Sequence, residues 1–416
     1  MNSSTLIRNV RLLCPASGLD IVSDILLRDG RIAHLGAGAA AGQQILDGSG
    51  CWLMPAAIDL AARLREPGAT QKASIASETE AALAAGVATL CMPPDTRPVA
   101  DTAAVVDRIH AKAAQAGAAR VRVLGALTQG LAGEALAELS ALKAAGVVGV
   151  SNGQRPLANS LVARRALEYA QGLGLTVHVQ AIDPALSNGG CAHEGAIATR
   201  LGLAPIPVAA EVAAIRQWIS LVEDTGGRVH FGRLSSARGA ELIESAQQRD
   251  LPVSADVAAH QLFLTDAALE GFNAQAHLLP PLRGEDDRQA LRSAVARGVI
   301  TAICSDHQPH EPDAKINPFP LTEPGASGVE TLLPLAIRLV HEGLLTPLQM
   351  AERLVDGPAR VLDLPLPIIE LGASLPLVLI DPRKEWTLQA GELRSRGHNT
   401  PFAGWQFRGK ALHSFV

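Results

Sequence analysis

Two patterns of hydrophobic and polar positions divide the chain into a long middle and two ends. Residues 1–52 alternate short apolar runs with turns, and Asp29-Gly30 stands between two such runs, which predicts a β-hairpin. Residues 366–416 repeat this pattern, with strands expected in PLVLIDP, EWTLQAGELRSRG and GWQFRGKALHSFV. In residues 53–365, short β-branched or apolar runs alternate instead with alanine-rich stretches of helical character, which often end in glycine.

The pattern of the middle segment predicts its fold. Eight apolar runs are each followed by a helical stretch: AAIDLAARL, VATLCMP, RVRVLGAL, VVGVS, LTVHVQ, RVHFGRLS, LPVSADV and VITAICSD. A strand and a helix repeated eight times are typical of a (β/α)8 TIM-type barrel. We therefore expect an α/β protein with a barrel over residues 53–365. A small β-sandwich domain, split in sequence, is expected from residues 1–52 and 366–416.

Composition narrows the classes of partner and cofactor. Of the 416 residues, 48% are hydrophobic and only 3% aromatic, and the net charge is −5 without a basic block, so we expect no nucleic acid partner. No stretch has the length and hydrophobicity of a signal peptide or a membrane span, and a cytoplasmic protein is expected. The five cysteines are dispersed, which argues against a cysteine metal site and for buried thiols. They are Cys14, Cys51, Cys91, Cys191 and Cys304.

Five segments carry a resemblance to a known family. They are LREPG, HEGAIATRLGLAPIPVAAE, SDHQPH, NPFPLTEPGASGVETLLPL and ELRSRGHNTPFAGWQFRGK. These segments are similar to the dihydroorotase family of the amidohydrolase superfamily, in particular its long bacterial type, and the similarity covers nearly the whole chain. The resemblance implies a barrel whose active site lies at the carboxyl ends of the strands. There, two divalent metals would activate water and polarise the substrate carbonyl.

Five of the six metal-ligand positions implied by this resemblance have lost the family's ligand. The histidine pair of the first strand falls on Ala61 and Arg63, and the acid of the fourth strand falls on Gly153. The histidines of the fifth and sixth strands fall on Gln180 and Arg233. Only the carboxylate of the eighth strand is retained, as Asp306. An arginine offers no lone pair and stays charged. We therefore expect no metal, no cofactor and no catalysis. An enclosed carboxylate without metals needs another cation, so Arg63 or Arg233 is expected to pair with Asp306.

The resemblance also implies a substrate-binding relic. The arginine of LREPG, which grips the substrate carboxylate in the family, is present as Arg65. The histidine that closes the strand-eight motif is present as His310. The amide of the strand-two motif has become Asp95 in PPDT, which puts a negative charge beside an anionic ligand. We therefore expect weak binding of dihydroorotate. Alternatively, Arg65 and His310 have a structural role and are held in place by the packing of their loops.

Two catalytic alternatives remain open. A different metal site could recruit His178, His230, His307 and His310. His178 shares a strand face with Gln180, which points it into the barrel, whereas His230 is out of phase with Arg233. Metal-free catalysis would instead use Asp306 as base and an arginine as electrophile, without the stabilisation that metals supply.

Within the resemblance, the chain is most similar to the non-catalytic dihydroorotase-like chain that accompanies bacterial aspartate carbamoyltransferase. This implies a pseudoenzyme of pyrimidine biosynthesis that supports the assembly or activity of that transferase. The expected partner is the transferase's catalytic chain in a homo- or hetero-oligomer, without nucleic acid or membrane. The alternative is a metal-free ligand-binding protein, or a residual amidohydrolase, acting on dihydroorotate or carbamoyl aspartate.

Overall fold

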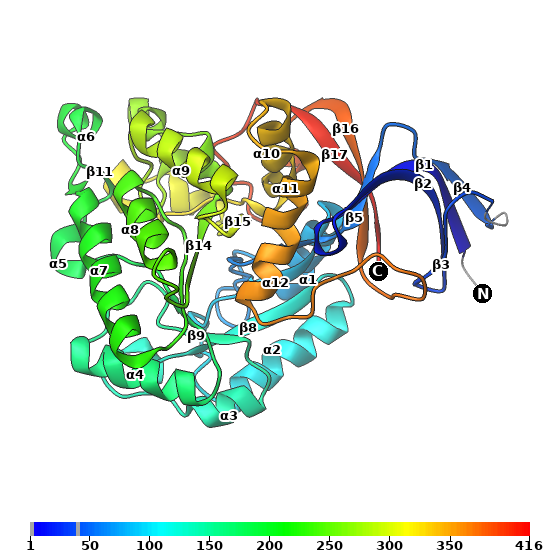
Figure 1. The fold of residues 1–416 in the computed structure, drawn as a ribbon. Coiled ribbons are helices and arrows are strands. Elements are labelled where there is room, and N and C mark those ends of the chain that lie inside the picture. Colours follow the sequence, from blue (N-terminus) through cyan, green and yellow to red (C-terminus); the bar gives the residue numbers. More distant parts are fainter. Residues whose placement is uncertain (1–3, 39–41) are drawn as a thin grey trace.

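A barrel and a β-sheet domain lie side by side in the computed structural model, which describes residues 4–38 and 42–416 (Figure 1). Residues 1–3 and 39–41 belong to the first expected stretch of β structure and lie outside the described residues. The predicted TIM-type barrel and the β domain built from both chain ends are confirmed. In the described chain, no helix combines the length and hydrophobicity needed to cross a bilayer.

The barrel strands follow one another in the order of the sequence and run parallel. They are β6 (Ala57–Asp59), β7 (Val87–Met92), β8 (Arg120–Ala126), β9 (Gly149–Ser151), β10 (Val177–Val179), β13 (Val229–Phe231), β14 (Val253–Ala258) and β15 (Ala302–Cys304). Seven of them lie within an expected run, and β14 extends one residue, Ala258, beyond the run LPVSADV. The first and last strands meet through a parallel bridge between Ala62 and His307, which brings the two ends of the sheet together.

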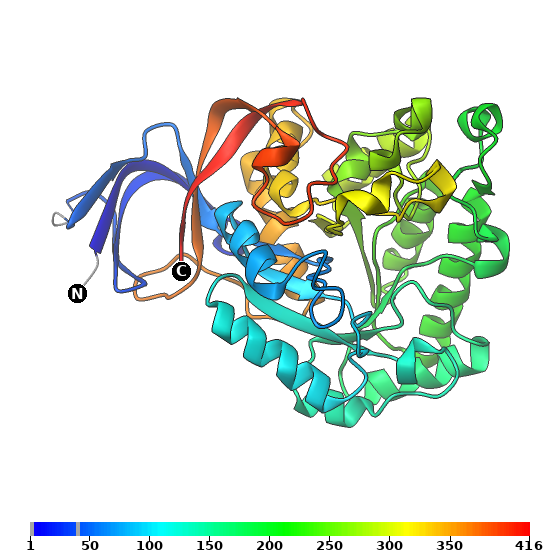
Figure 2. The same ribbon diagram turned by 180° about the vertical axis from the view of Figure 1, so that it is seen from behind.

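Helices surround the strands, as Figures 1 and 2 show from opposite sides. They are α1 (Ile75–Ala84), α2 (Ala103–Ala116), α3 (Leu139–Ala144), α4 (Ser160–Gly172), α5 (Pro184–Ser187), α6 (Ala196–Leu201), α7 (Val208–Thr225), α8 (Ala237–Gln247), α9 (Glu285–Arg297), α10 (Val329–His341), α11 (Pro347–Ala351) and α12 (Gly357–Val361). Glycine was expected to mark the ends of many helices. In α9 this is confirmed, because Gly298 caps the helix with a left-handed φ of 86°.

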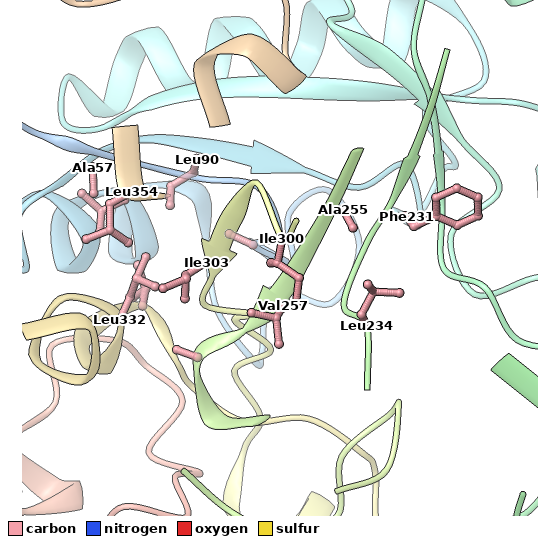
Figure 3. Close-up of a cluster of buried hydrophobic side chains, with 14 of the residues drawn as sticks. Ala57, Leu90, Phe231, Leu234, Ala255, Val257, Ile300, Ile303, Leu332 and Leu354 are labelled. Carbon is pink, nitrogen blue, oxygen red and sulfur yellow. The ribbon is translucent and has the colours of Figure 1, made fainter. Parts of the chain in front are cut away.

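Aliphatic side chains fill the space between strands and helices, as the low aromatic content requires. Phe231 and Val257 from the barrel strands and Leu332 from α10 are fully buried there (Figure 3). A separate cluster that includes Ile58 and Leu124 joins residues of α12. Truncating a fully buried phenylalanine such as Phe231 to alanine costs about 3–5 kcal/mol.

The two chain ends form one connected sheet. Its strands are β1 (Ser4–Cys14), β2 (Leu19–Arg28), β3 (Arg31–Leu35), β4 (Gln44–Asp47), β5 (Trp52–Pro55), β16 (Leu377–Thr387) and β17 (Gln406–Phe415), in the order β17-β16-β5-β1-β2-β3 with β4 beside β1. The two ends meet where β16 pairs antiparallel with β5. The predicted hairpin turn is confirmed, since Asp29 and Gly30 both have positive φ, 50° and 71°.

One expectation for the C-terminal strands is corrected. The runs PLVLIDP and EWT belong to a single strand, β16, and the remainder of EWTLQAGELRSRG forms a short 3-10 helix and a loop. Pro382 has no N–H to donate, and the pairing of β16 with β17 is irregular between Asp381 and Glu385. The irregular pairing accommodates the proline, so the strand continues past Pro382 instead of ending there.

Candidate functional site

The residues at the former ligand positions lie together at the carboxyl ends of the barrel strands, here called the mouth. The bridge at Ala62 fixes this geometry, because the Arg63 backbone N–H donates to the His307 carbonyl at 2.8 Å. Arg63 therefore follows β6 directly beside Asp306, which follows β15. Arg233 approaches the same carboxylate from the end of β13.

Both arginines pair with Asp306, which confirms the expectation that Arg63 or Arg233 faces this carboxylate. The distance from Arg63 Nη1 to Asp306 Oδ1 is 3.8 Å, and that from Arg233 Nη1 is 3.6 Å. These are ion pairs without a direct hydrogen bond, since Oδ1 of Asp306 accepts none. The other oxygen accepts from Gln308 Nε2 at 3.0 Å. Arg63 also donates through Nε to Asp95 Oδ2 at 2.7 Å.

Burial sets the charge balance at the mouth. It raises the pKa of the Asp306 carboxyl above its ordinary value, and Arg233 and Arg63 offset part of that rise. Burial also disfavours the Arg63 cation, but Asp95 and Asp306 outweigh this effect and raise the pKa of the guanidinium. Arg63 is only 7% exposed, so a charge left without its partner there would be expensive. Asp95 thus neutralises Arg63 while its carboxylate also lines the space beside Arg65.

The remaining positions offer little to a metal. Ala61 is buried and has no donor atom, and Gly153 has no side chain and a left-handed φ of 61°. Gln180 has its amide oxygen occupied by Arg233 Nη2 at 2.9 Å. The free space among these residues is about 30 Å³, which holds roughly one water molecule.

A pair of divalent metals does not fit these residues. Asp306 is the one carboxylate left at the six positions, and two guanidinium groups lie within 4 Å of it. Each unit of like charge at about 4 Å opposes binding by roughly 4 kcal/mol at an effective dielectric constant of about 20. Among residues 4–38 and 42–416, no group of three or more His, Cys, Asp or Glu side chains is arranged to hold a metal.

The four histidines of the alternative metal site do not converge on one point. His178 and His230 lie beside each other inside the barrel, with ring centroids 5.2 Å apart. His178 therefore points inward, as its strand face predicted. His230, expected to be out of phase with Arg233, lines the same interior space as Arg233. The left-handed φ of 59° at Arg233 breaks the alternation of the strand. His307 is engaged elsewhere, with Nε2 2.8 Å from Glu78 Oε2. His310 contacts Arg65 instead, with its Nε2 3.0 Å from Arg65 Nη2.

The sequence reasoning missed Asp256, which organises the polar interior below the mouth. Its carboxylate lies 2.8 Å from His230 Nε2, accepts from the Arg233 backbone N–H at 2.7 Å, and accepts from Cys304 Sγ at 3.2 Å. Burial raises its pKa, but the bonds from His230 and Arg233 prevail and hold it below the ordinary value. A lone carboxylate inside the apolar run LPVSADV was the available signal, since such a residue needs buried partners.

Arg65 lines a pocket of about 340 Å³, here called the relic pocket, and His310 contacts Arg65 from behind the pocket wall. Arg65 Nε donates to the Pro309 carbonyl at 2.9 Å, and its Nη2 lies 3.0 Å from His310 Nε2. Lys72, also missed from the sequence, lies 3.0 Å from His310 Nδ1. Burial, Arg65 and Lys72 lower the pKa of His310 to about 2, so its ring is neutral. The two residues expected to grip a carboxylate thus already contact protein groups.

Comparisons with known proteins identify the family of the chain. A family model described as "Dihydro-orotase-like" matches residues 50–238. A "Dihydroorotase-like protein" of Pseudomonas aeruginosa is 48% identical over 412 residues, covering 99% of this chain and 97% of the relative. A "Dihydroorotase" of Anaeromyxobacter dehalogenans is 40% identical over 420 residues, covering 100% and 97%. The chain belongs to the dihydroorotase-like family.

Solved amidohydrolases share the fold of this dihydroorotase-like chain. An L-hydantoinase from Arthrobacter aurescens superposes with a TM-score of 0.88 at 22% sequence identity, covering 100% of this chain and 95% of the other. A D-hydantoinase gives a TM-score of 0.83 at 21% identity, covering 98% and 92%. At such identities the likeness concerns the fold alone.

The dihydroorotase-like chain has unusual backbone conformations at its strand ends. Arg65, Arg233 and Asp306 all have positive φ, at 63°, 59° and 45°. A non-glycine residue in this region costs about 1–2 kcal/mol and persists only where its surroundings fix it. The strained loops of an active-site mouth are therefore present, although the residues they carry do not form a metal site.

Proposed function

We propose that this chain is a catalytically inactive dihydroorotase-like subunit of pyrimidine biosynthesis that supports the assembly or activity of aspartate carbamoyltransferase. The observation that carries the proposal is the pair of guanidinium groups, from Arg63 and Arg233, that faces Asp306 where the family's metals would be bound. Metal-activated water and a polarised carbonyl are the basis of the family's reaction. Residues that repel a dication remove that basis.

The intact scaffold supports the second half of the proposal. The family resemblance extends over 99% of the chain, and the barrel, the β domain and the strained strand ends are all formed. A protein that keeps its fold without its chemistry must act through its surface or through a pocket. Fold by itself does not assign that role, so the partner rests on the similarity to the non-catalytic chain that accompanies the transferase.

The proposal is tested by mixing the purified chain with the aspartate carbamoyltransferase catalytic chain of the same organism. Sedimentation velocity and light scattering should show a complex heavier than either protein, and an obligate interface would bury more than about 2,000 Å² in total. Transferase activity should rise or become more stable to dilution in the mixture. Serum albumin at equal concentration controls for crowding. A transferase that assembles and works identically with and without the chain contradicts the proposal.

A second candidate function is a sensor of small anions, because the relic pocket gathers four cationic side chains. Arg63, Arg65, Lys72 and Arg97 line it together with Asp95, Glu311 and Glu323. In this reading, orotate or carbamoyl aspartate would raise the melting temperature, and Arg65→Ala would abolish the shift. Turnover of dihydroorotate without metal would indicate a residual amidohydrolase instead. No shift with either compound excludes the sensor.

A further inference from the structure

A second cavity, larger than the relic pocket, opens between helices α4 and α7. Its volume is about 520 Å³, within the range of roughly 300–1,000 Å³ that is usual for small-molecule sites. It extends from the loops that follow β9 and β10 down to the outer face of β10. We call it the α4–α7 cleft. The proposed function makes no use of it.

The interior of the cleft is apolar. Val177 and Val179 from β10 form its floor, Ala163 from α4 and Ala214 from α7 form its sides, and Trp218 of α7 adds an indole surface. Trp218 is only 9% exposed, so its ring lies in the wall and not on the outer surface. The small side chains of Ala163 and Ala214 leave space between the two helices.

Hydrogen-bonding groups without net charge surround this interior. Gln217 Nε2 donates to Ser160 Oγ at 3.0 Å and so links α7 to the start of α4. Gln154 lines the opposite loop and is exposed. Asp183, the one carboxylate in the described lining, accepts from the Leu186 backbone N–H at 2.8 Å as the cap of α5. Asp183 is half-buried at the edge of α5, and Arg155 at the rim is solvent-exposed.

The inner end of the cleft reaches the degenerate mouth. Gly153, His178 and Gln180 line both spaces. His178 is only 7% exposed, and its Nε2 has no hydrogen-bond partner within the protein. Burial lowers the pKa of His178 well below its ordinary value, so the ring is neutral. This nitrogen packs against Gly149 of β9 inside the barrel, so the cleft meets the carbon face of the ring and its inner end stays apolar.

We propose that the α4–α7 cleft binds an uncharged, flat nitrogen heterocycle of nucleobase or nucleoside size. The faces of such a ring match the valine, alanine and tryptophan walls, and its ring nitrogens and carbonyls match the amides of Gln154 and Gln217. An anionic ligand finds no buried cation in the described lining. The inference concerns a site apart from Arg65 and His310, and it does not depend on the transferase complex.

Ligand-observed saturation-transfer NMR on the full chain tests this proposal with indole, adenine and adenosine as probes. At least one probe should bind with a Kd of about 1 mM or tighter, as small ring compounds do in matching pockets. Ala214→Leu fills the cleft and should weaken that binding at least about tenfold. Ala213→Leu is the matched control, because Ala213 is exposed on the same helix, and it should leave binding unchanged.

A second variant guards against loss of folding in Ala214→Leu. Gln217 is exposed, so Gln217→Tyr should fold normally and obstruct the entrance to the cleft. Thermal unfolding of each variant verifies the fold before binding is measured. Absence of saturation transfer from all three probes overturns the proposal. Equal binding by the parent chain and a folded Ala214→Leu or Gln217→Tyr variant overturns it as well.

Discussion

The mouth of the barrel and the segment around α12 each hold a buried carboxylate, and the two are treated differently. Asp306 at the mouth has guanidinium groups on two sides and a hydrogen bond from Gln308. Asp356, which precedes α12, has no hydrogen-bond partner for either oxygen, and its nearest cation, Arg360 Nη2, is 3.9 Å away. Burial raises the pKa of Asp356 to about 6. The difference teaches that cations are placed specifically around the buried carboxylate at the mouth. At Asp356 the fold instead tolerates a buried carboxylate without such partners, at a cost in stability.

Removing the central cation of the mouth should have the largest effect on stability. Arg63→Met leaves Asp95 and Asp306 without their shared partner, and we expect a loss of about 3–5 kcal/mol in the free energy of unfolding. Urea denaturation followed by circular dichroism measures it. Arg97→Met is the control, since Arg97 is exposed and its replacement should cost little.

A double variant sharpens this test. In Arg63→Met, Asp306 keeps only Arg233 as a cationic neighbour. Adding Asp306→Asn removes this under-compensated buried charge, so it should recover at least about 1 kcal/mol of the loss. If Arg63→Met is as stable as the parent chain, the ion pairs at the mouth do not have the role described here.

The unpartnered carboxylate near α12 should respond in the opposite direction. Asp356→Asn removes a buried charge, and we expect the chain to gain about 1–2 kcal/mol at pH 8. The parent is most stable, relative to this variant, below the ordinary aspartate pKa of 3.8, where Asp356 is protonated in both states. Its stability falls as the pH rises through about 6. The gain should therefore open between about pH 4 and pH 6.

The control for that pH dependence is Asp313→Asn, at an exposed position. Its stability should follow that of the parent chain at every pH. A gain for Asp356→Asn that is constant from pH 4 to pH 8 would contradict a raised carboxyl pKa as its cause.

The smallest effect is expected beside the relic pocket, where Arg65 and Lys72 contact the neutral ring of His310. Lys72→Met removes the group 3.0 Å from His310 Nδ1, together with its ion pair to Glu323. The loss should be about 1 kcal/mol. The pKa of His310, about 2 in the parent, should rise toward its ordinary value, because Lys72 is one of the charges that lower it. NMR titration of the His310 ring measures this, and an unchanged titration would show that burial and Arg65 suffice.

The sequence predicted the fold because its signals were local. Each barrel strand is a short apolar run followed by a helical stretch, and each β structure at the ends has alternation and turn residues. The continuity of β16 through Pro382 was not predictable in this way, because it depends on pairing with β5 and β17, which lie far away in sequence.

The candidate site was predictable only where the family resemblance supplied positions. The pairing of Arg63 and Arg233 with Asp306 followed from the cost of an enclosed charge. Asp256 and Lys72 were missed, because their roles depend on contacts across the barrel, with His230 on a neighbouring strand and with His310 after β15. Sequence spacing cannot show such contacts.

Metal content is the measurement that tests the central claim most directly. The chain is purified from cells grown with added zinc, its metals are measured by elemental analysis, and dihydroorotase activity is assayed in both directions with and without a chelator. Because Ala61, Arg63, Gly153, Gln180 and Arg233 stand at the ligand positions, we predict well under one metal ion per chain and no turnover. One or two metal ions per chain, with turnover that the chelator abolishes, would contradict the account.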